Sequence, residues 1–266
     1  RSKTLYNNIQ IKVLSLPRIT NFTDFVPLSE YQDVEMTYVT RGRPIGEADM
    51  VIIPGAENPR ESMELIRKFG WDEELKSLVK KGSVVFGIGM GFFLLGNTIK
   101  YAKNEFEVEH IDGLGLMDFE AEIDEEQIPV RVSGKVKDNI SCPANVLRKT
   151  KVEGYQIYSG KTKAKGNLQE FIKIEKYFDE TANISEGLIS PSGQILGTTV
   201  HGIFECSDFC SRFINGVKAI KLGEADDENI PSFDFKAFKE EQYDKWADVV
   251  RDTLNMEKIY EIIGIK

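Results

Sequence analysis

The sequence predicts an α/β protein: a mostly parallel sheet flanked by helices, with an antiparallel β extension and a C-terminal helical segment. Two observations predict the parallel part. Short β-rich runs alternate with stretches of helical periodicity along the first part of the chain. The fourth of these runs, residues 84–88, is apolar throughout, as expected for a strand that is covered on both faces.

Four strands are predicted in this first part, at residues 11–16, 34–39, 50–53 and 84–88. Apolar residues at helical spacing predict two helices before the fourth strand, one marked by Met63, Ile66 and Phe69 and one by Leu75, Leu78 and Val79. Parallel sheets bind ligands beyond the carboxyl ends of their strands. The turns at Pro54-Gly55-Ala56 and at Gly89 lie at such ends and are therefore candidate site segments.

The second part of the chain reads as antiparallel. Short alternating segments occupy residues 119–136, 154–158 and 171–178, and a turn at 192–194 leads into a strand at 195–200. That strand delivers His201 at its end, and a helix follows up to Gly223. We expect a linker remnant at residues 1–9, one domain at 10–223, and an acidic linker with a helical appendage at 224–266.

Composition limits the class of protein. The net charge of −9 argues against a nucleic-acid partner, which needs a clustered basic face. No apolar run is long enough to cross a membrane. Three cysteines do not make a disulfide framework and suit a reducing, cytoplasmic setting. The chain starts with Arg1 instead of methionine, which indicates a piece of a longer protein.

The stretch FGIGMGFFLLG at residues 86–96 predicts a sharp strand-to-helix turn. In many α/β enzymes such a turn holds a nucleophile above the sheet, beside backbone N–H groups that stabilise developing negative charge. Here the residue at the tip is Gly89, which has no side chain. The sequence thus predicts the shape of an active site without its nucleophile.

Seven stretches together resemble the glutamine amidotransferase half of cobyric acid synthase, a class I, triad-type amidotransferase. They are IKVLSLPRITNFTDFVPL (11–28), ADMVIIPGAEN (48–58), GIGMGFFLLG (87–96), GLGLMDFEAEI (113–123), VEGYQIYSG (152–160), GTTVHGIF (197–204) and FKEEQYDKWADVVRDTL (238–254). They occur in that family's order and cover nearly the whole chain. The resemblance implies a flavodoxin-like sheet of the class I amidotransferase type.

The resemblance also implies a reaction. A cysteine at the elbow attacks the side-chain amide of glutamine, a histidine moves the proton, and ammonia passes to an N-terminal ATP-dependent synthetase domain or subunit that amidates corrinoid carboxylates. ATP and Mg belong to that separate domain, and neither a cofactor nor a metal is expected in this one. His201 matches the histidine, and the cysteine position falls on Gly89. The oxyanion donors would come from Met90 and from the turn at Gly55 and Ala56.

The departures from the family pattern cluster around one pocket. Besides Gly89, the glycine after the nucleophile is Met90, and a tyrosine and a substrate-holding glutamine are Phe92 and Phe93. A carboxylate and an imidazole of the family are Gln156 and Tyr158. A single change to glycine would fit an engineered substrate trap, whereas several changes around one pocket indicate a lineage that stopped hydrolysing glutamine.

Structural explanations compete with each of these features. The glycines of the turn serve close helix–strand packing by themselves, and this reading ranks ahead of catalysis. Cys206 and Cys210 could share a metal with His201, but buried structural thiols are favoured because zinc normally takes four ligands. The competing function is a non-enzymatic ligand-binding or regulatory module. A phosphate-binding ATP domain encoded directly upstream would favour amidation over that module.

Overall fold

The fold was determined as a computed structural model, which describes residues 8–104, 107–140, 144–223 and 233–264. The chain divides into two compact units, Arg1–Ser232 and Phe233–Lys266. The first unit carries the sheet and the candidate site. The second contains only helices among its described residues.

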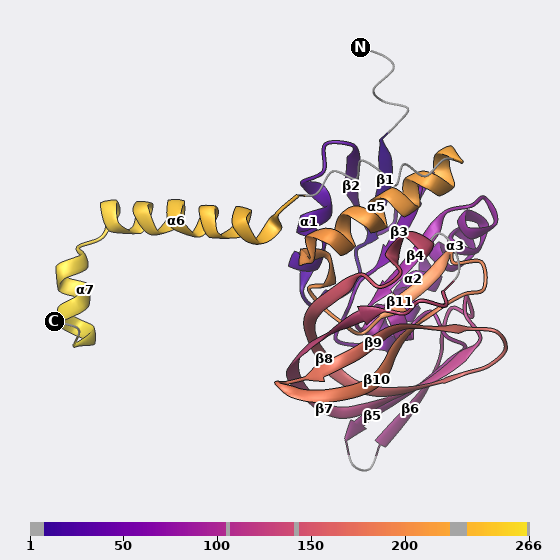
Figure 1. The fold of residues 1–266 in the computed structure, drawn as a ribbon. Coiled ribbons are helices and arrows are strands. Elements are labelled where there is room, and N and C mark those ends of the chain that lie inside the picture. Colours follow the sequence, from indigo (N-terminus) through magenta and orange to yellow (C-terminus); the bar gives the residue numbers. More distant parts are fainter. Residues whose placement is uncertain (1–7, 105–106, 141–143, 224–232, 265–266) are drawn as a thin grey trace. The chain divides into compact units, whose positions relative to one another are not determined.

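A parallel sheet forms the centre of the first unit (Figure 1). Its strands run in the order β2-β1-β3-β4-β11, and every neighbouring pair among them is parallel. The strands are β1 (Ile9–Leu14), β2 (Val34–Val39), β3 (Met50–Ile53), β4 (Val84–Ile88) and β11 (Ile195–Thr198). β3, β4 and β11 are buried at every residue, which confirms the sandwiched strand that the apolar run at 84–88 predicted.

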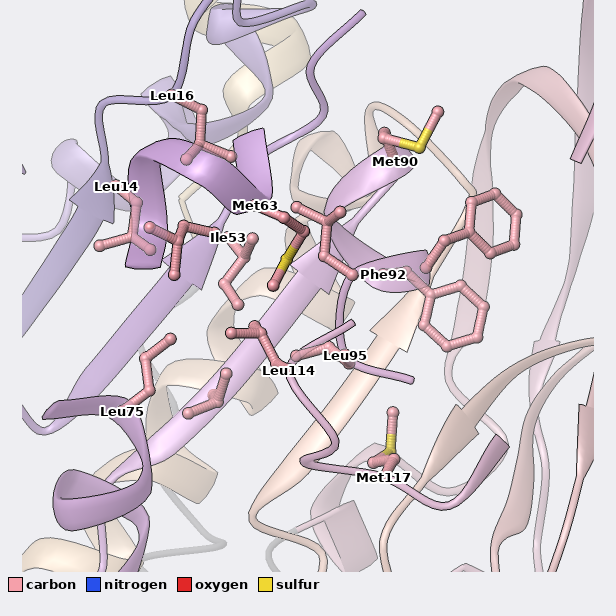
Figure 2. Close-up of a cluster of buried hydrophobic side chains, with 14 of the residues drawn as sticks. Leu14, Leu16, Ile53, Met63, Leu75, Met90, Phe92, Leu95, Leu114 and Met117 are labelled. Atoms are coloured by element: carbon pink, nitrogen blue, oxygen red, sulfur yellow. The ribbon is translucent and has the colours of Figure 1, made fainter. Parts of the chain in front are cut away.

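Helices cover both faces of these strands. Val85 belongs to a buried cluster with residues of α2 (Pro59–Lys68) and α3 (Trp71–Lys80), part of which is drawn in Figure 2. Its neighbour Phe86 points the other way and packs edge-on against Phe213 of α5 (Ser207–Leu222), at 5.3 Å between ring centroids. Because successive side chains of a strand alternate between faces, β4 joins the two layers.

The antiparallel extension continues the same sheet, so that the described residues hold one sheet of eleven strands. Its strands are β5 (Thr98–Asn104), β6 (Glu107–Asp112), β7 (Phe119–Val136), β8 (Lys151–Ala164), β9 (Gln169–Tyr177) and β10 (Glu180–Ile189). β10 pairs with β11 through the predicted turn, where Gly193 has a φ of 74°. The long strand β7 pairs with β5, β8 and β9, and so ties the extension together.

Short helical turns complete the first unit. They are η1 (Phe22–Phe25), α1 (Val26–Ser29), α4 (Met90–Phe93), η2 (Ala144–Leu147) and η3 (Ile203–Glu205). Three of them, η1, α4 and η3, lie at carboxyl ends of the parallel strands or directly beyond them. These segments build the candidate site.

The C-terminal unit consists of α6 (Phe235–Thr253) and α7 (Met256–Ile263). The predicted C-terminal helical segment is present as two helices, because the chain breaks at Leu254, which has an extended backbone. Asn255 then caps α7 by accepting a hydrogen bond from the Lys258 backbone N–H at 3.0 Å. The predicted linker at 224–229 lies outside the described residues.

Candidate functional site

Three segments far apart in the sequence meet at one point beyond the sheet. They are the turn after β3 at Gly55, the turn after β4 at Gly89, and the segment after β11 at His201. A Cβ atom built on Gly89 would lie 2.5 Å from His201 Nε2, and one built on Gly55 would lie 3.1 Å from His201 Cε1. The histidine therefore faces the elbow tip, and all three segments follow the carboxyl ends of parallel strands.

Gly89 has the strained backbone of a nucleophile elbow. Its φ of 56° and ψ of −127° are accessible to glycine but costly for a residue with a side chain. Its N–H donates to the Thr198 carbonyl of the neighbouring strand at 2.9 Å, which anchors the turn to β11. The next glycine, Gly91, is packed so closely that an added Cβ would lie 2.0 Å from the Ile53 carbonyl oxygen. The elbow geometry is thus present although the nucleophile is not.

His201 is fully buried and is held on several sides. Its backbone exchanges two hydrogen bonds with Tyr155 of β8, at 2.8 and 3.1 Å, and the Tyr155 ring stacks on the imidazole at 5.6 Å between centroids. Its Nδ1 lies 2.7 Å from Oδ2 of the buried Asp24 in η1. The imidazole plane is therefore fixed by a strand pairing, a stacked ring and a carboxylate.

Asp24, Asn21 and Tyr155 are site residues that the sequence reasoning did not single out. The Tyr155 hydroxyl donates to Asn21 Oδ1 at 3.1 Å, and Asn21 Nδ2 lies 3.4 Å from His201 Nδ1. Partial burial, together with the charges of Asp24 and Glu205, raises the pKa of Tyr155 to about 12. Asn21 and Asp24 belong to the stretch LPRITNFTDF, which is part of a motif that carries the family resemblance. That motif could have pointed to both residues as members of the site.

Two buried polar atoms at this point have no hydrogen-bond partner in the described structure. One is His201 Nε2 and the other is the hydroxyl oxygen of Thr20. The Thr20 oxygen would lie 2.7 Å from a Cβ built on Gly55, so both atoms border the glycine turns. Buried polar groups are almost always satisfied, and exceptions concentrate where chemistry or binding occurs.

A separate cavity of about 520 Å³ lies beside the elbow helix α4. It is bordered by Phe92 and Phe93 of α4, by Gln156 of β8 and by Thr199 between β11 and His201. Gln156 Nε2 donates to the Thr199 hydroxyl at 2.6 Å. The volume falls in the range of small-molecule sites.

One wall of this cavity carries a buried carboxyl group, Glu186 of β10. It accepts hydrogen bonds from the Thr198 hydroxyl at 2.5 Å, from the Thr199 N–H at 2.6 Å and from the Thr199 hydroxyl at 2.8 Å. Burial raises the pKa of Glu186, and these donors oppose that shift. The carboxyl group therefore fixes the last residue of β11, Thr198, and the residue that follows it, Thr199.

The predicted site residues fall into two groups. Gly55, Gly89 and His201 surround the elbow tip, with Met90 and Ala56 buried directly after the two glycines. Phe93 and Gln156 border the cavity instead, and the side chain of Tyr158 lies outside the described part of the structure. The geometry thus separates the predicted oxyanion region from part of the predicted substrate pocket.

The two described cysteines belong to the packing around α5. Burial raises the pKa of Cys210 to about 12, so its thiol stays protonated at neutral pH. Cys206 accepts a hydrogen bond from the Glu153 N–H at 3.1 Å. Cys142 lies outside the described residues. Among the described residues, no three His, Cys, Asp or Glu side chains are grouped to hold a metal ion.

Comparison with known proteins places this arrangement in a family. Residues 10–209 match the CobB/CobQ-like glutamine amidotransferase domain, and the chain belongs to that family. It is 39% identical over 257 residues to cobyric acid synthase of Thermoanaerobacter sp. (strain X514), covering 96% of this chain and 50% of that protein. It is 35% identical over 266 residues to cobyric acid synthase of Clostridium botulinum (strain Kyoto / Type A2), covering 100% of this chain and 52% of that protein. The chain therefore spans about half the length of these curated relatives.

Solved structures confirm the fold class. A glutamine amidotransferase structure superposes with a TM-score of 0.56 at 16% identity, covering 79% of this chain and 98% of that one. A glutamine amidotransferase from Thermotoga maritima superposes with a TM-score of 0.50 at 15% identity, covering 84% of this chain and 88% of that one. At such low identity the likeness concerns the fold alone. In the described part of the chain, no helix is long and apolar enough to span a membrane.

Proposed function

We propose that this chain is the amidotransferase-type domain of a cobyric acid synthase in corrinoid (cobalamin) biosynthesis, and that it no longer hydrolyses glutamine. The identity to cobyric acid synthases over nearly the whole chain supports the first part. One observation carries the second part: Nε2 of His201 faces an elbow tip that has no side chain. A base without a thiol cannot form the covalent intermediate of a thiol amidase.

The partner in this proposal is an ATP-dependent synthetase domain or subunit. The unmatched half of the curated relatives is where such a domain would lie. ATP and Mg are assigned to it, and corrinoid carboxylates are the acceptors. Free ammonia would replace glutamine as the nitrogen donor, and the present domain would serve as a structural or channel-forming partner. We place the whole assembly in the cytoplasm.

Two assays test this function. The chain alone is incubated with glutamine, and ammonia release is expected to stay at the level of a no-protein control. The chain is then co-expressed with the synthetase half of the Thermoanaerobacter relative and supplied with ATP, Mg and a corrinoid acid, with either glutamine or ammonium chloride. We expect amide formation with ammonium only. Amidation with glutamine would contradict the loss of glutaminase activity.

A second candidate function is a ligand-binding module derived from the same fold. The cavity of about 520 Å³ favours it, because Phe93 and Gln156, two residues of the predicted substrate pocket, border a space of ligand size. Calorimetry with glutamine and with a panel of small metabolites tests this candidate. Because Phe93 offers no hydrogen bond, no micromolar binding of glutamine is expected, and tight binding of another compound without amidation in the assay above would favour the module.

A further inference from the structure

We propose that Asp24 is the positioning carboxylate of His201: it holds the imidazole in the tautomer that carries its proton on Nδ1 and leaves the lone pair of Nε2 directed at position 89. This inference concerns the arrangement of the site itself. It goes beyond the proposed function and does not depend on the acceptor, the partner or the nitrogen donor.

The first argument is the geometry of the contact. Asp24 Oδ2 lies 2.7 Å from His201 Nδ1, and both side chains are buried. The other oxygen, Oδ1, accepts the N–H of Gly202 at 2.9 Å. Asp24 therefore binds the histidine and the backbone of the next residue at once, so the carboxylate cannot turn away from the imidazole without leaving the Gly202 N–H unsatisfied.

The second argument is the chemistry of the two groups. An ionised carboxylate only accepts hydrogen bonds, so a bond between Asp24 and Nδ1 requires the proton on Nδ1. In the neutral ring, Nε2 is then the acceptor. That atom is buried, has no partner among the described residues, and lies 2.5 Å from the position a Cβ on Gly89 would take. The lone pair consequently faces the elbow tip at position 89.

A competing contact exists and is weaker. Asn21 Nδ2 lies 3.4 Å from the same Nδ1, and as a donor it would favour the opposite tautomer. The Asp24 contact is 0.7 Å shorter (3.4 − 2.7) and involves a charged acceptor, which makes it the stronger hydrogen bond. Asn21 also accepts from the Tyr155 hydroxyl through its oxygen, and this bond orients the amide beside the ring. Asn21 therefore supports the positions of Tyr155 and His201.

The third argument is the role that such a carboxylate plays in other hydrolases. In Ser-His-Asp triads a buried aspartate on Nδ1 fixes the tautomer and the orientation of the histidine, and the constellation is recognised by geometry instead of sequence order. Here Asp24 precedes His201 by 177 residues. It reaches the histidine because η1, which follows β1, and η3, which follows β11, pack against each other beyond the same edge of the sheet.

Nitrogen NMR of the histidine side chains tests this inference. The chain has two histidines, and the second, His110, is exposed on β6 and serves as an internal reference. In the unaltered chain at neutral pH, we expect long-range ¹H–¹⁵N spectra to show His201 with a protonated Nδ1 and an unprotonated Nε2. His110 should show the averaged pattern of a solvent-exposed ring.

The variant Asp24→Asn is isosteric and can present an N–H to Nδ1. We expect the His201 pattern to reverse, with the proton on Nε2, while the His110 pattern is unchanged. The matched control is Asp208→Asn, which removes a carboxylate that pairs with Arg212 on the surface of α5. It should leave both histidines as they are.

Two outcomes would overturn the proposal. One is an unaltered chain whose His201 carries its proton on Nε2, a measurement that needs no variant and so stands even if Asp24→Asn fails to fold. The other is a folded Asp24→Asn variant with an unchanged His201 pattern. A carboxylate that merely supported the fold would alter stability without moving the ring proton.

Discussion

The imidazole of His201 occupies the space that a side chain on Gly89 would need. A Cβ atom at position 89 would lie 2.5 Å from Nε2 and 2.6 Å from Cε1, both far inside van der Waals contact. The ring has little freedom to withdraw, because Asp24 and Tyr155 hold it from two sides. The glycine and the position of the histidine are therefore matched to each other.

Gly89→Ala should destabilise the protein more than an ordinary glycine substitution. The backbone of Gly89, with φ 56° and ψ −127°, costs on the order of 1–3 kcal/mol for alanine, and the collision with His201 adds about 1–3 kcal/mol. The control is Gly46→Ala, whose φ is 72° but whose added Cβ meets no atom within 4 Å. Urea unfolding should show a larger loss in free energy of unfolding for Gly89→Ala. Equal losses would mean that the imidazole yields freely.

Gly89→Cys is expected to release no ammonia from glutamine above the parent protein. The added side chain would collide with His201 as it does in the alanine variant, which displaces the thiol from a productive position. A nucleophile also accelerates a reaction only when the substrate is held in line, and positioning supplies on the order of 7 kcal/mol or more of the barrier. Phe93 offers no hydrogen bond to the substrate. The new thiol should still react with iodoacetamide.

A coupled ammonia assay compares Gly89→Cys with the double variant Gly89→Cys plus Phe93→Gln. Turnover that needs the second change would assign a substrate-holding role to position 93. Robust turnover in the single variant would instead show that the pocket is intact and that the glycine is an isolated change.

Glu186 should make stability fall as pH rises. Burial raises the pKa of this carboxyl group above the ordinary 4.5, so between the ordinary and the raised value the folded state binds more protons than the unfolded state. The contribution of Glu186 to the free energy of unfolding is therefore fully present at pH values below the ordinary pKa. It is lost as the pH rises through the raised pKa of the folded state. Glu186→Gln should remove this slope when urea unfolding is measured at pH 4.5 and at a series of higher pH values.

Glu170→Gln provides a control of opposite sign. Hydrogen bonds from Lys137 and Ser185 lower the pKa of Glu170. Its contribution to the free energy of unfolding is therefore present at pH values above the ordinary pKa, and it disappears as the pH falls through the lowered pKa of the folded state. Parallel pH profiles for the two variants would contradict the assignment of the Glu186 shift to burial.

Cys210 should resist alkylation while the protein is folded. With a pKa of about 12, its thiolate fraction near pH 8 is on the order of one in ten thousand, and the sulfur is also shielded from solvent. Cys206 is partly exposed and should react with iodoacetamide before Cys210. Peptide mapping by mass spectrometry of folded and urea-unfolded samples measures both sites, and rapid modification of folded Cys210 would show that α5 opens readily.

Much of the parallel sheet could be read from the sequence. The runs at 34–39, 50–53 and 84–88 became β2, β3 and β4 with the predicted bounds. For β3 and β4 the reason is that continuous apolar stretches have few alternatives to a buried strand. β2 is largely half-buried or exposed, and its β-branched and aromatic residues marked it as a strand. The first strand was misplaced: it was predicted at 11–16 and spans Ile9–Leu14. Leu16 is buried but lies in the turn before Pro17, so burial alone did not mark the strand end.

The sequence by itself determined which backbone turns could form a site, because glycine at positions 55 and 89 and a histidine at a strand end leave a local signature. Only the tertiary structure decided that Asp24 serves His201, since a hydrogen bond across 177 residues has no periodicity or spacing to reveal it. The same holds for the cavity bordered by Phe93, Gln156 and Glu186, which α4, β8, β9 and β10 enclose. Local propensity fixes strands and turns, whereas the partners of a buried polar group are chosen by chain segments that meet only on folding.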